Sequence, residues 1–354
     1  MHERQLQLKE NVAMKVSVVI PVFNGEATIA ETLDSVFAQR FDGGFEVIVV
    51  NDGSTDGTRA VLEKYGDRIR VIEQENRGIS AARNAGLKVS AGEYIALLDA
   101  DDTWTEDKLE KTVPVLQENL ECVAVFSDAT VVKGPGRVLF ENYIDACYAH
   151  SPTLDEMLKV AWPILPSTIV VRRETLLEIG GFPEEFGKEY GCEDTFAFLL
   201  LRERGEMHFV ADKLLRYRIF SEVKDYFAKR IPADGDEPAD LERSYAGNLV
   251  FARLIRDRFG ARGRHHVRSA IAGVGRGLVS LGLMAIHEGD RALAIRYYRA
   301  SLRYRPIDPK TYVRMAWAAL PAEITGKFTG ILTPRLRRSL SGPPTNLHDR
   351  PQRI

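Results

Sequence analysis

The sequence predicts an α/β protein in which a mostly parallel central sheet is flanked by helices and followed by a C-terminal helical appendage. Two observations support this class. From Lys15 onward, short apolar runs rich in β-branched residues alternate with helical segments, which is typical of βαβ units. An acidic stretch with Pro and Gly at 232–240 then separates this body from segments that all have helical patterns.

The elements of the first half follow from residue pattern. Apolar runs predict buried strands, and helical periodicity or small-residue composition predicts helices. The expected strands are 16–20, 45–50, 69–72, 94–98 and 123–127, and the expected helices are 27–39, 55–65 and 80–89.

The pattern weakens after residue 127. Residues 133–165 contain Gly134-Pro135-Gly136 and scattered aromatics, which indicates an irregular, loop-rich region. Further strands are expected at 167–171, 207–210 and 214–219, and further helices at 174–179, 193–204, 241–259, 268–287, 291–305 and 309–320. The predicted organisation is an N-terminal extension 1–14, a main domain 15–231 with halves 15–128 and 129–231, a linker 232–240, a helical region 241–332 and a disordered basic tail 333–354.

Composition excludes several classes of protein. The chain is 45% apolar and 28% charged, as in globular proteins, so it is neither disordered, collagenous nor a disulfide scaffold. Three cysteines without CxxC spacing indicate a reducing compartment and argue against zinc. The charged N-terminus does not resemble a signal peptide, and the most apolar stretch, 269–286, is interrupted by Arg276. We therefore expect a cytoplasmic chain.

Charge is distributed unevenly along the chain. The net charge is −2, yet residues 241–354 hold 21 Lys and Arg against 7 Asp and Glu, a local net charge of +14. The acidic body suits a metal ion, and the Arg-rich end suits an anionic partner. One interpretation places this end on anionic lipid at the inner face of the plasma membrane, and the other has it pack on the acidic body. Nucleic acid is not expected, because no basic strand motif with aromatic residues occurs.

Polar residues follow three predicted strands whose carboxyl ends meet at one edge of the sheet. The first polar segment surrounds Asn24, the second contains Asp52, and the third is Asp99-Ala100-Asp101. Residues i and i+2 of an extended segment share a face, so Asp99 and Asp101 can point at one ligand. A pair this sparse suits Mg²⁺ or Mn²⁺ better than Ca²⁺. The alternative is that this acidic segment only caps the next helix.

Two further residues have both a functional and a plain structural interpretation. Asp52 either reads the edge of a base or ribose, or forms an Asx turn into Gly53-Ser54. Arg83 either steadies a diphosphate or is a solvated arginine.

Taken together, these residues resemble family 2 glycosyltransferases. The matching segments are Val18–Glu26, Val49–Asp56, Asn76-Arg77-Gly78, Ala82–Gly86, Leu97–Asp102, Gly180-Gly181-Phe182 and Cys192-Glu193-Asp194. They occur in the family's order over about residues 14–220. The resemblance implies a Rossmann-like nucleotide-diphospho-sugar transferase fold.

The resemblance also implies roles for individual residues. Pro21, Phe23 and Glu26 would line the nucleotide pocket, Asp52 would bind the base, Arg83 would lie near the diphosphate, Asp99 would bind ribose or sugar, Asp101 would bind the metal, and Asp194 with Glu193 beside it would be the catalytic base. Many members complete the metal shell with a His after the last body strands, where this chain has Tyr217-Arg218-Ile219-Phe220. The third metal contact is therefore either a water molecule or absent.

These roles predict an inverting glycosyltransferase that uses Mn²⁺ or Mg²⁺. It would move a sugar from a nucleotide-diphosphate donor, UDP- or GDP-linked, to a hydroxyl of a glycan or lipid-linked glycan, as in cell-surface polysaccharide synthesis. Two alternatives stay open. A nucleotidyltransferase of similar topology would need a basic phosphate loop after the first strand, which Phe23–Glu26 lacks. A non-catalytic sugar-nucleotide-binding or scaffold protein would not need Asp52, Asp99, Asp101 and Asp194 together.

Overall fold

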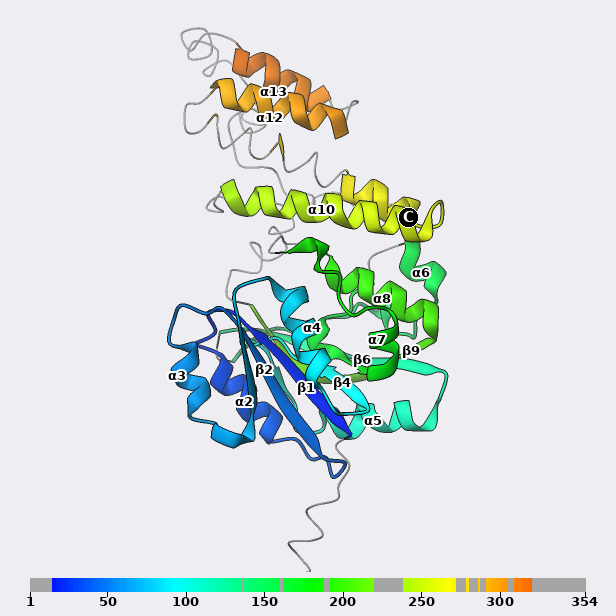
Figure 1. Cartoon of the computed structure of the whole chain (residues 1–354). Coiled ribbons are helices and arrows are strands. Elements are labelled where there is room, and N and C mark those ends of the chain that lie inside the picture. The colour runs from blue at the N-terminus through cyan, green and yellow to red at the C-terminus, as the bar shows by residue number, and fades with distance from the viewer. Residues whose placement is uncertain are drawn as a thin grey trace, which may run out of the picture. The chain divides into compact units, whose positions relative to one another are not determined.

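The computed structural model describes residues 15–134, 136–159, 162–187, 192–219, 238–271, 278–279, 286, 291–304 and 309–319. The chain divides into two compact units, which are considered separately below (Figure 1). The first comprises residues 1–188 and 192–220, and the second residues 189–191 and 221–354. The predicted extension 1–14, most of the linker 232–240 and the tail 333–354 lie outside the described residues.

A nine-stranded sheet forms the centre of the first unit (Figure 1). The strands are β1 (Val16–Val22), β2 (Phe45–Asp52), β3 (Arg70–Gln74), β4 (Tyr94–Leu97), β5 (Thr103–Trp104), β6 (Cys122–Lys133), β7 (Arg137–Phe140), β8 (Ile169–Arg172) and β9 (Glu206–Ile219). Their order is β3-β2-β1-β4-β8-β6-β9-β5, with β7 paired to β6. Strands β3 to β4 in this order are parallel, whereas β8 is antiparallel to both β4 and β6.

Helices cover both faces of the parallel half. The first unit contains α2 (Ile29–Phe37), α3 (Thr58–Glu63), α4 (Ile79–Val89), α5 (Lys108–Glu118), α6 (Leu154–Lys159), α7 (Arg173–Glu178) and α8 (Glu193–Arg204). Alternate residues of β2 point to opposite faces. Val47 and Val49 belong to a core cluster with α2, α3 and α5, whereas Ile48 and Val50 pack with Ala82 of α4. Burial on both faces explains the continuous apolar runs that predict these strands.

The predicted fold class is confirmed, with several local differences. The short elements β5, β7 and α6 are not predicted, and the last two lie in the region 133–165 that was expected to be irregular. Helix α5 is not predicted, and it contains Pro114, a residue that normally interrupts helices. Strand β6 continues to Lys133, six residues beyond the predicted end. The two predicted strands at 207–210 and 214–219 are one strand, β9, whose exposed residues 211–213 lie where its register with β6 shifts. A β-bulge therefore produces the polar interruption.

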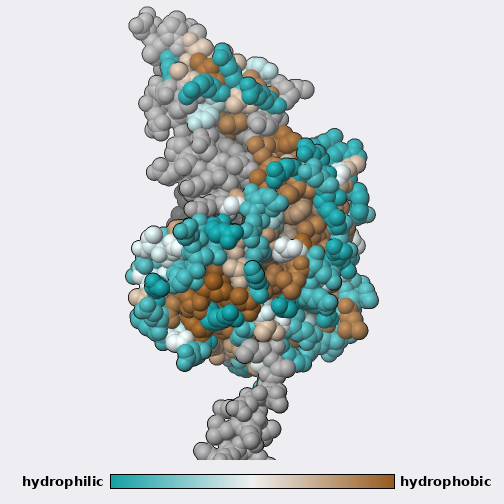
Figure 2. Space-filling model, in the orientation of Figure 1, coloured by the Kyte–Doolittle hydropathy of each residue, from teal (hydrophilic) through white to brown (hydrophobic). Residues whose placement is uncertain are grey.

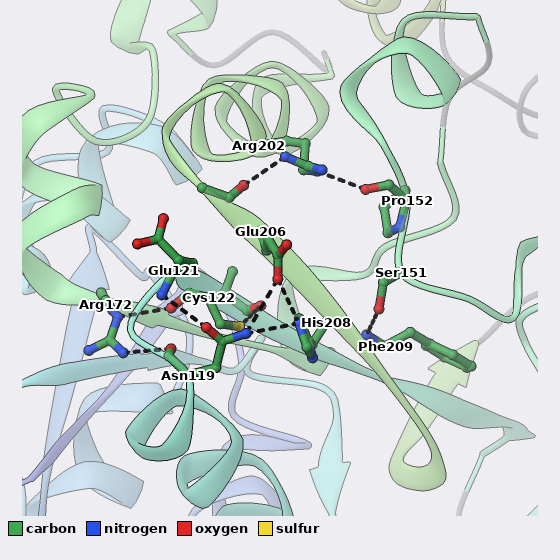
Figure 3. Close-up of polar contacts among 12 residues, drawn as sticks. Asn119, Glu121, Cys122, Ser151, Pro152, Arg172, Arg202, Glu206, His208 and Phe209 are labelled. Carbon is green, nitrogen blue, oxygen red and sulfur yellow. Dashed lines mark hydrogen bonds and ion pairs between the residues drawn. The ribbon is translucent and has the colours of Figure 1, made fainter.

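The edge of the sheet at the start of β6 and β9 is held by Arg172 (Figure 3). Its Nε donates to the carbonyl of Cys122 at 2.9 Å, and its Nη2 donates to the carbonyls of Asn119, at 3.1 Å, and Leu116. Leu116 lies in the last turn of α5, where the backbone carbonyls have no partner within the helix. Asn119 also donates to Glu206 at 3.3 Å, which ties the same turn to the start of β9. Arg172 thus joins α5, β6 and β8 at this edge.

Most of the surface of the first unit in Figure 2 is hydrophilic, with hydrophobic areas between the polar side chains. The exposed apolar side chains belong to separate elements. Examples are Phe23 after β1, Val71 in β3, Leu120 after α5 and Leu177 in α7. Scattered apolar side chains of this kind are normal on protein surfaces.

The second unit is helical where it is described. It contains α10 (Pro238–Phe259), α12 (Arg291–Tyr304) and α13 (Pro309–Ala319). Ala294 and Tyr298 of α12 pack with Ala318 of α13 and with Val279 in a small buried cluster. Among the described residues of the chain, no helix is both long and apolar enough to cross a bilayer.

Gly86 allows α4 to approach β1 closely, and we predict that Gly86→Ala destabilises the protein. An added Cβ would lie 2.4 Å from Cγ1 of Val19. Overpacking of this kind costs about 1–3 kcal/mol. In an exposed helix the same change would instead raise stability by about 1 kcal/mol. Urea denaturation followed by circular dichroism measures the sign, with exposed Lys88→Ala on the same helix as the control. A gain in stability for Gly86→Ala would contradict the close approach.

Candidate active site

The loops after β1 and β2 are joined by hydrogen bonds before any ligand binds. Asn24 lies in the left-handed region with a φ of 53°, and its Oδ1 accepts the Thr55 amide at 2.8 Å. Its own amide donates to Ser54 Oγ at 2.9 Å. The Gly25 amide donates to Thr58 Oγ1 at 2.9 Å. Asn tolerates this backbone conformation better than most residues, so the two loops form one fixed edge of the site.

Asp52 is buried at the end of β2, and both of its carboxylate oxygens are engaged. Oδ1 accepts from the Arg77 amide at 2.8 Å and from Gln74 Nε2 at 2.7 Å, and Oδ2 accepts from the Gly78 amide at 2.9 Å. The Asx turn into Ser54 is made instead by Asn51 Oδ1, at 3.2 Å. Asp52 therefore fixes the segment that leads into α4, and its contact with a base stays a prediction.

The three residues predicted to line the nucleotide pocket differ in exposure. Phe23 is 50% exposed at the end of β1, where its ring is available for stacking. Pro21 is buried within β1. Glu26 is exposed, and its Oε2 accepts the Gly57 amide at 2.8 Å, so its carboxylate holds the loop before α3. Phe23 and Glu26 are thus exposed, and only Pro21 is buried.

Arg83 is the centre of the polar site. Its side chain is 1% exposed, and it contacts two carboxylates from distant parts of the chain. Nη2 lies 2.9 Å from Asp99 Oδ1 after β4, and Nη1 lies 3.1 Å from Glu193 Oε1 at the start of α8. The structure therefore excludes the solvated arginine. With its charge already shared by two carboxylates, Arg83 is placed to position them, and a contact with a diphosphate stays a prediction.

Asn84, the residue after Arg83, binds the backbone of the Gly180-Gly181-Phe182 segment. Asn84 accepts the Phe182 amide and donates to the Phe182 carbonyl, both at 2.8 Å. Gly181 has a φ of +73°, and a Cβ there would lie 2.4 Å from Asn84 Oδ1. Glycine is therefore required for this close approach. The Phe182 ring lies under the Arg83 guanidinium, 5.2 Å from its centroid, which completes the enclosure of that charge.

Asp99 and Asp101 form the part of the site that fits a cation. Burial and the charge of Asp99 raise the pKa of Asp101 to about 6. Asp99 is paired with Arg83, whereas Asp101 has no ion pair among the described residues, so a divalent ion beside Asp101 would offset the repulsion between the two carboxylates. Among the described residues, no group of three or more His, Cys, Asp or Glu side chains has metal-binding geometry. The donor set therefore fits Mg²⁺ or Mn²⁺ held by one or two carboxylates and completed by water and phosphate oxygens.

Asp102 has a structural role that sequence reasoning did not assign. Its Oδ2 accepts from Ser167 Oγ at 2.6 Å, and its Oδ1 accepts from the Arg218 amide at 2.9 Å. Burial, followed by the charges of Asp101 and Asp99, raises its pKa well above the usual value. Arg218 was also missed: its strand was recognised, but a single residue there carries no motif. Asp102 thus joins the end of β4 to β9 and to the turn before β8.

Glu193 and Asp194 begin α8, and their environments differ. Burial and the charge of Asp194 raise the pKa of Glu193 to about 7, while Arg83 opposes this shift. Asp194 does not cap the helix, because the N-cap is Cys192. Its Oδ1 accepts the Thr195 amide at 2.6 Å, and its Oδ2 has no hydrogen bond among the described residues. Burial also raises the pKa of Asp194.

Several of the predicted residues therefore lie together in one polar site around Arg83 and Asp99. The charge of Asp99 acts on both Asp101 and Asp194, which places these two carboxyls around the same residue. Asp52 is connected to them through the segment that begins α4, the helix that carries Arg83. The individual roles of these residues stay predictions.

Comparison with known proteins shows which family the first part of the chain resembles. Residues 17–177 match the family model described as "Glycosyl transferase family 2". An uncharacterized glycosyltransferase of Nostoc sp. is 29% identical over 261 residues, which is 70% of this chain and 78% of that protein. TuaG of Bacillus subtilis, named as a teichuronic acid biosynthesis glycosyltransferase, is 38% identical over 148 residues, or 41% of this chain and 57% of that protein.

A solved structure agrees with the fold. The mannosyltransferase PcManGT from Pyrobaculum calidifontis, in complex with GDP-Man and Mn²⁺, has a TM-score of 0.51 at 20% identity. The alignment covers 90% of this chain and 94% of that one. Identity this low supports the fold alone. Residues 17–177 of this chain thus match glycosyl transferase family 2, and the relatives that it resembles are named as glycosyltransferases.

Proposed function

We propose that the protein is an inverting glycosyltransferase that moves a sugar from a UDP- or GDP-linked donor to a hydroxyl of a glycan or lipid-linked glycan, as in cell-surface polysaccharide synthesis. One observation carries the proposal: Arg83 joins Asp99, on the donor side, to Glu193, beside the candidate base. A transfer reaction needs a donor site and a base close together, and the ion pairs of Arg83 support this because they hold Asp99 and Glu193 at one place. A donor-binding scaffold would not need Asp194 there.

The donor half of the site would hold the nucleotide diphosphate. Phe23 would stack on the base, Asp52 would contact its edge, and Asp99 would bind ribose or sugar. Mn²⁺ or Mg²⁺ held by Asp101 would neutralise the charge that develops on the departing diphosphate. PcManGT is in complex with GDP-Man and Mn²⁺, and we propose that this chain uses a donor and an ion of the same kind.

The acceptor half would supply the base. A sugar hydroxyl is a weak nucleophile, and a positioned carboxylate that takes its proton contributes about 10²–10⁴ in rate. Asp194 suits this role because its Oδ2 makes no hydrogen bond among the described residues and burial raises its pKa toward the working range. Attack from the face opposite the diphosphate in a single displacement would invert the anomeric carbon.

We predict that the wild-type protein slowly releases UDP or GDP from members of a sugar-nucleotide panel, and that Mn²⁺ stimulates this release. Asp101→Ala should abolish the stimulation, because it removes the carboxylate proposed to hold the ion. Coupled detection of the released nucleoside diphosphate measures the effect, with exposed Asp42→Ala as the control. Full Mn²⁺ stimulation in Asp101→Ala would remove Asp101 from the metal site.

We predict that Asp194→Asn lowers transfer by about 10²–10⁴ while leaving donor affinity unchanged. In the wild type, transfer should fall as the pH drops through the raised pKa of Asp194, because the base must be unprotonated. The acid limb of kcat/KM should therefore lie above 3.8, the ordinary value for aspartate. Rate measurements across pH and donor titration test both parts, with exposed Asp67→Asn as the control. Unimpaired transfer by Asp194→Asn would assign the base elsewhere.

We also propose that the basic end of the chain attaches the protein to an anionic membrane surface at the cytoplasmic face. Arg262, Arg264 and Arg268 are exposed in the second unit, within a stretch of net charge +14. Each surface charge contributes about 1 kcal/mol near an anionic bilayer, and the attraction weakens with salt. The acceptor would then be a lipid-linked glycan presented at that surface.

Sedimentation with anionic vesicles tests this attachment. We expect the protein to pellet with anionic vesicles at low salt, and not with neutral ones. Arg264→Glu with Arg268→Glu should weaken pelleting. The matched charge reversals Arg40→Glu with Arg59→Glu, at residues 72% and 70% exposed in the first unit, should not. Failure of the wild type to pellet at low salt would contradict the attachment.

A further inference from the structure

Arg218 is a second arginine at the site with a largely buried side chain, and the contacts of the folded chain leave part of its hydrogen-bonding capacity unused. It is the penultimate residue of β9, and its amide donates to Asp102 Oδ1 at 2.9 Å, which anchors its backbone beside the acidic segment. The side chain is 9% exposed. Its Nη2 pairs with Glu31 of α2, whose own side chain is 55% exposed.

The Nε–H of Arg218 has no hydrogen-bond acceptor among the described residues. Buried N–H groups are nearly always paired, so an unpaired one at a functional site calls for an acceptor from outside the chain. Arg218 also lies beside the acidic segment, because its own amide donates to Asp102, the residue that follows Asp101. Arg218 and Asp101 form no ion pair with each other among the described residues.

The chemistry of an acceptor at this position is restricted. It must be an anion or a polar oxygen that approaches both Arg218 and the ion-binding Asp101. Phosphate oxygens meet this requirement, since they bind divalent ions and fit the planar fork of arginine. A neutral sugar hydroxyl would leave most of the positive charge unbalanced.

We propose that Arg218 binds the diphosphate of the sugar-nucleotide donor through its Nε–H, as a fixed positive charge that shares the neutralisation of the leaving group with the divalent ion. This assignment rests on the proposed function. Among the described residues, no three side chains form a metal site. The positive charge of Arg218 would then supply part of the neutralisation that further metal contacts would otherwise provide. Diphosphate binding should therefore persist in part when the metal is removed.

Calorimetric binding of UDP and GDP in EDTA tests the assignment. We expect the wild type to bind one of the two measurably without metal, and more tightly with Mn²⁺. Arg218→Gln should weaken the metal-free binding by about tenfold or more, the effect of losing a charged hydrogen bond. Arg218→Lys keeps the positive charge but loses the planar guanidinium, so its metal-free affinity should lie between those of the wild type and Arg218→Gln. Binding of the nucleoside alone, uridine or guanosine, should not change.

Two control variants separate this role from a structural one. Arg216→Gln removes an exposed arginine two residues away on the same strand and should leave binding unchanged. Glu31→Gln removes the ion-pair partner of Arg218 without removing the guanidinium, and should also retain binding. If Arg218 served only to hold α2 against β9, Glu31→Gln and Arg218→Gln would weaken binding equally and would affect the nucleoside as well.

The outcomes distinguish this inference from the proposed function. If the wild type binds UDP or GDP but Arg218→Gln binds it equally well in EDTA, the assignment of Arg218 is wrong and the proposed function stands. If the wild type binds neither nucleotide even with Mn²⁺, the proposed donor class fails and the assignment fails with it. Selective loss of diphosphate binding in Arg218→Gln, with both controls normal, supports the assignment.

Discussion

The buried guanidinium of Arg83 is the constraint on which the site depends. A charge with 1% exposure cannot remain in a folded protein without opposite charges beside it. Asp99 and Glu193 meet that need, and in doing so they bring the end of β4 and the start of α8 to the same helix, α4. The acidic segment after β4 and the residue beside the candidate base at the start of α8 are therefore held in position by one side chain of the first unit.

The acidic residues around Arg83 fall into two kinds. Asp102 has both oxygens bonded within the protein and serves the architecture. Asp101 and Asp194 carry raised pKa values at a site where Arg83 and Arg218 supply the positive charge. Neighbouring carboxylates at the site thus differ in their hydrogen bonds: both oxygens of Asp102 are bonded within the protein, whereas Asp194 Oδ2 makes no hydrogen bond among the described residues.

Residues that belong to short sequence motifs could be predicted as site residues. Contacts between single residues far apart in the chain could not. Asn84, Gly181 and Phe182 could be recognised as motif residues, but only the structure reveals that the first binds the third across a required glycine. The burial of Arg83 was not predictable, because arginine is usually exposed and its two partners are 16 and 110 residues away. Helix α5 was missed for a different reason, since Pro114 in its interior contradicts the usual helical pattern.

The opposite edge of the sheet is stabilised by a separate set of contacts. Arg172 binds three backbone carbonyls where α5 ends and β6 begins, at the ends of the strands away from the polar site. Leu120, in the same turn, is 81% exposed. A fluorophore attached there through an introduced cysteine would lie beside the clamp that closes this edge and far along the strands from the reacting groups. Such a label would report on the opening of the fold while leaving the chemistry undisturbed.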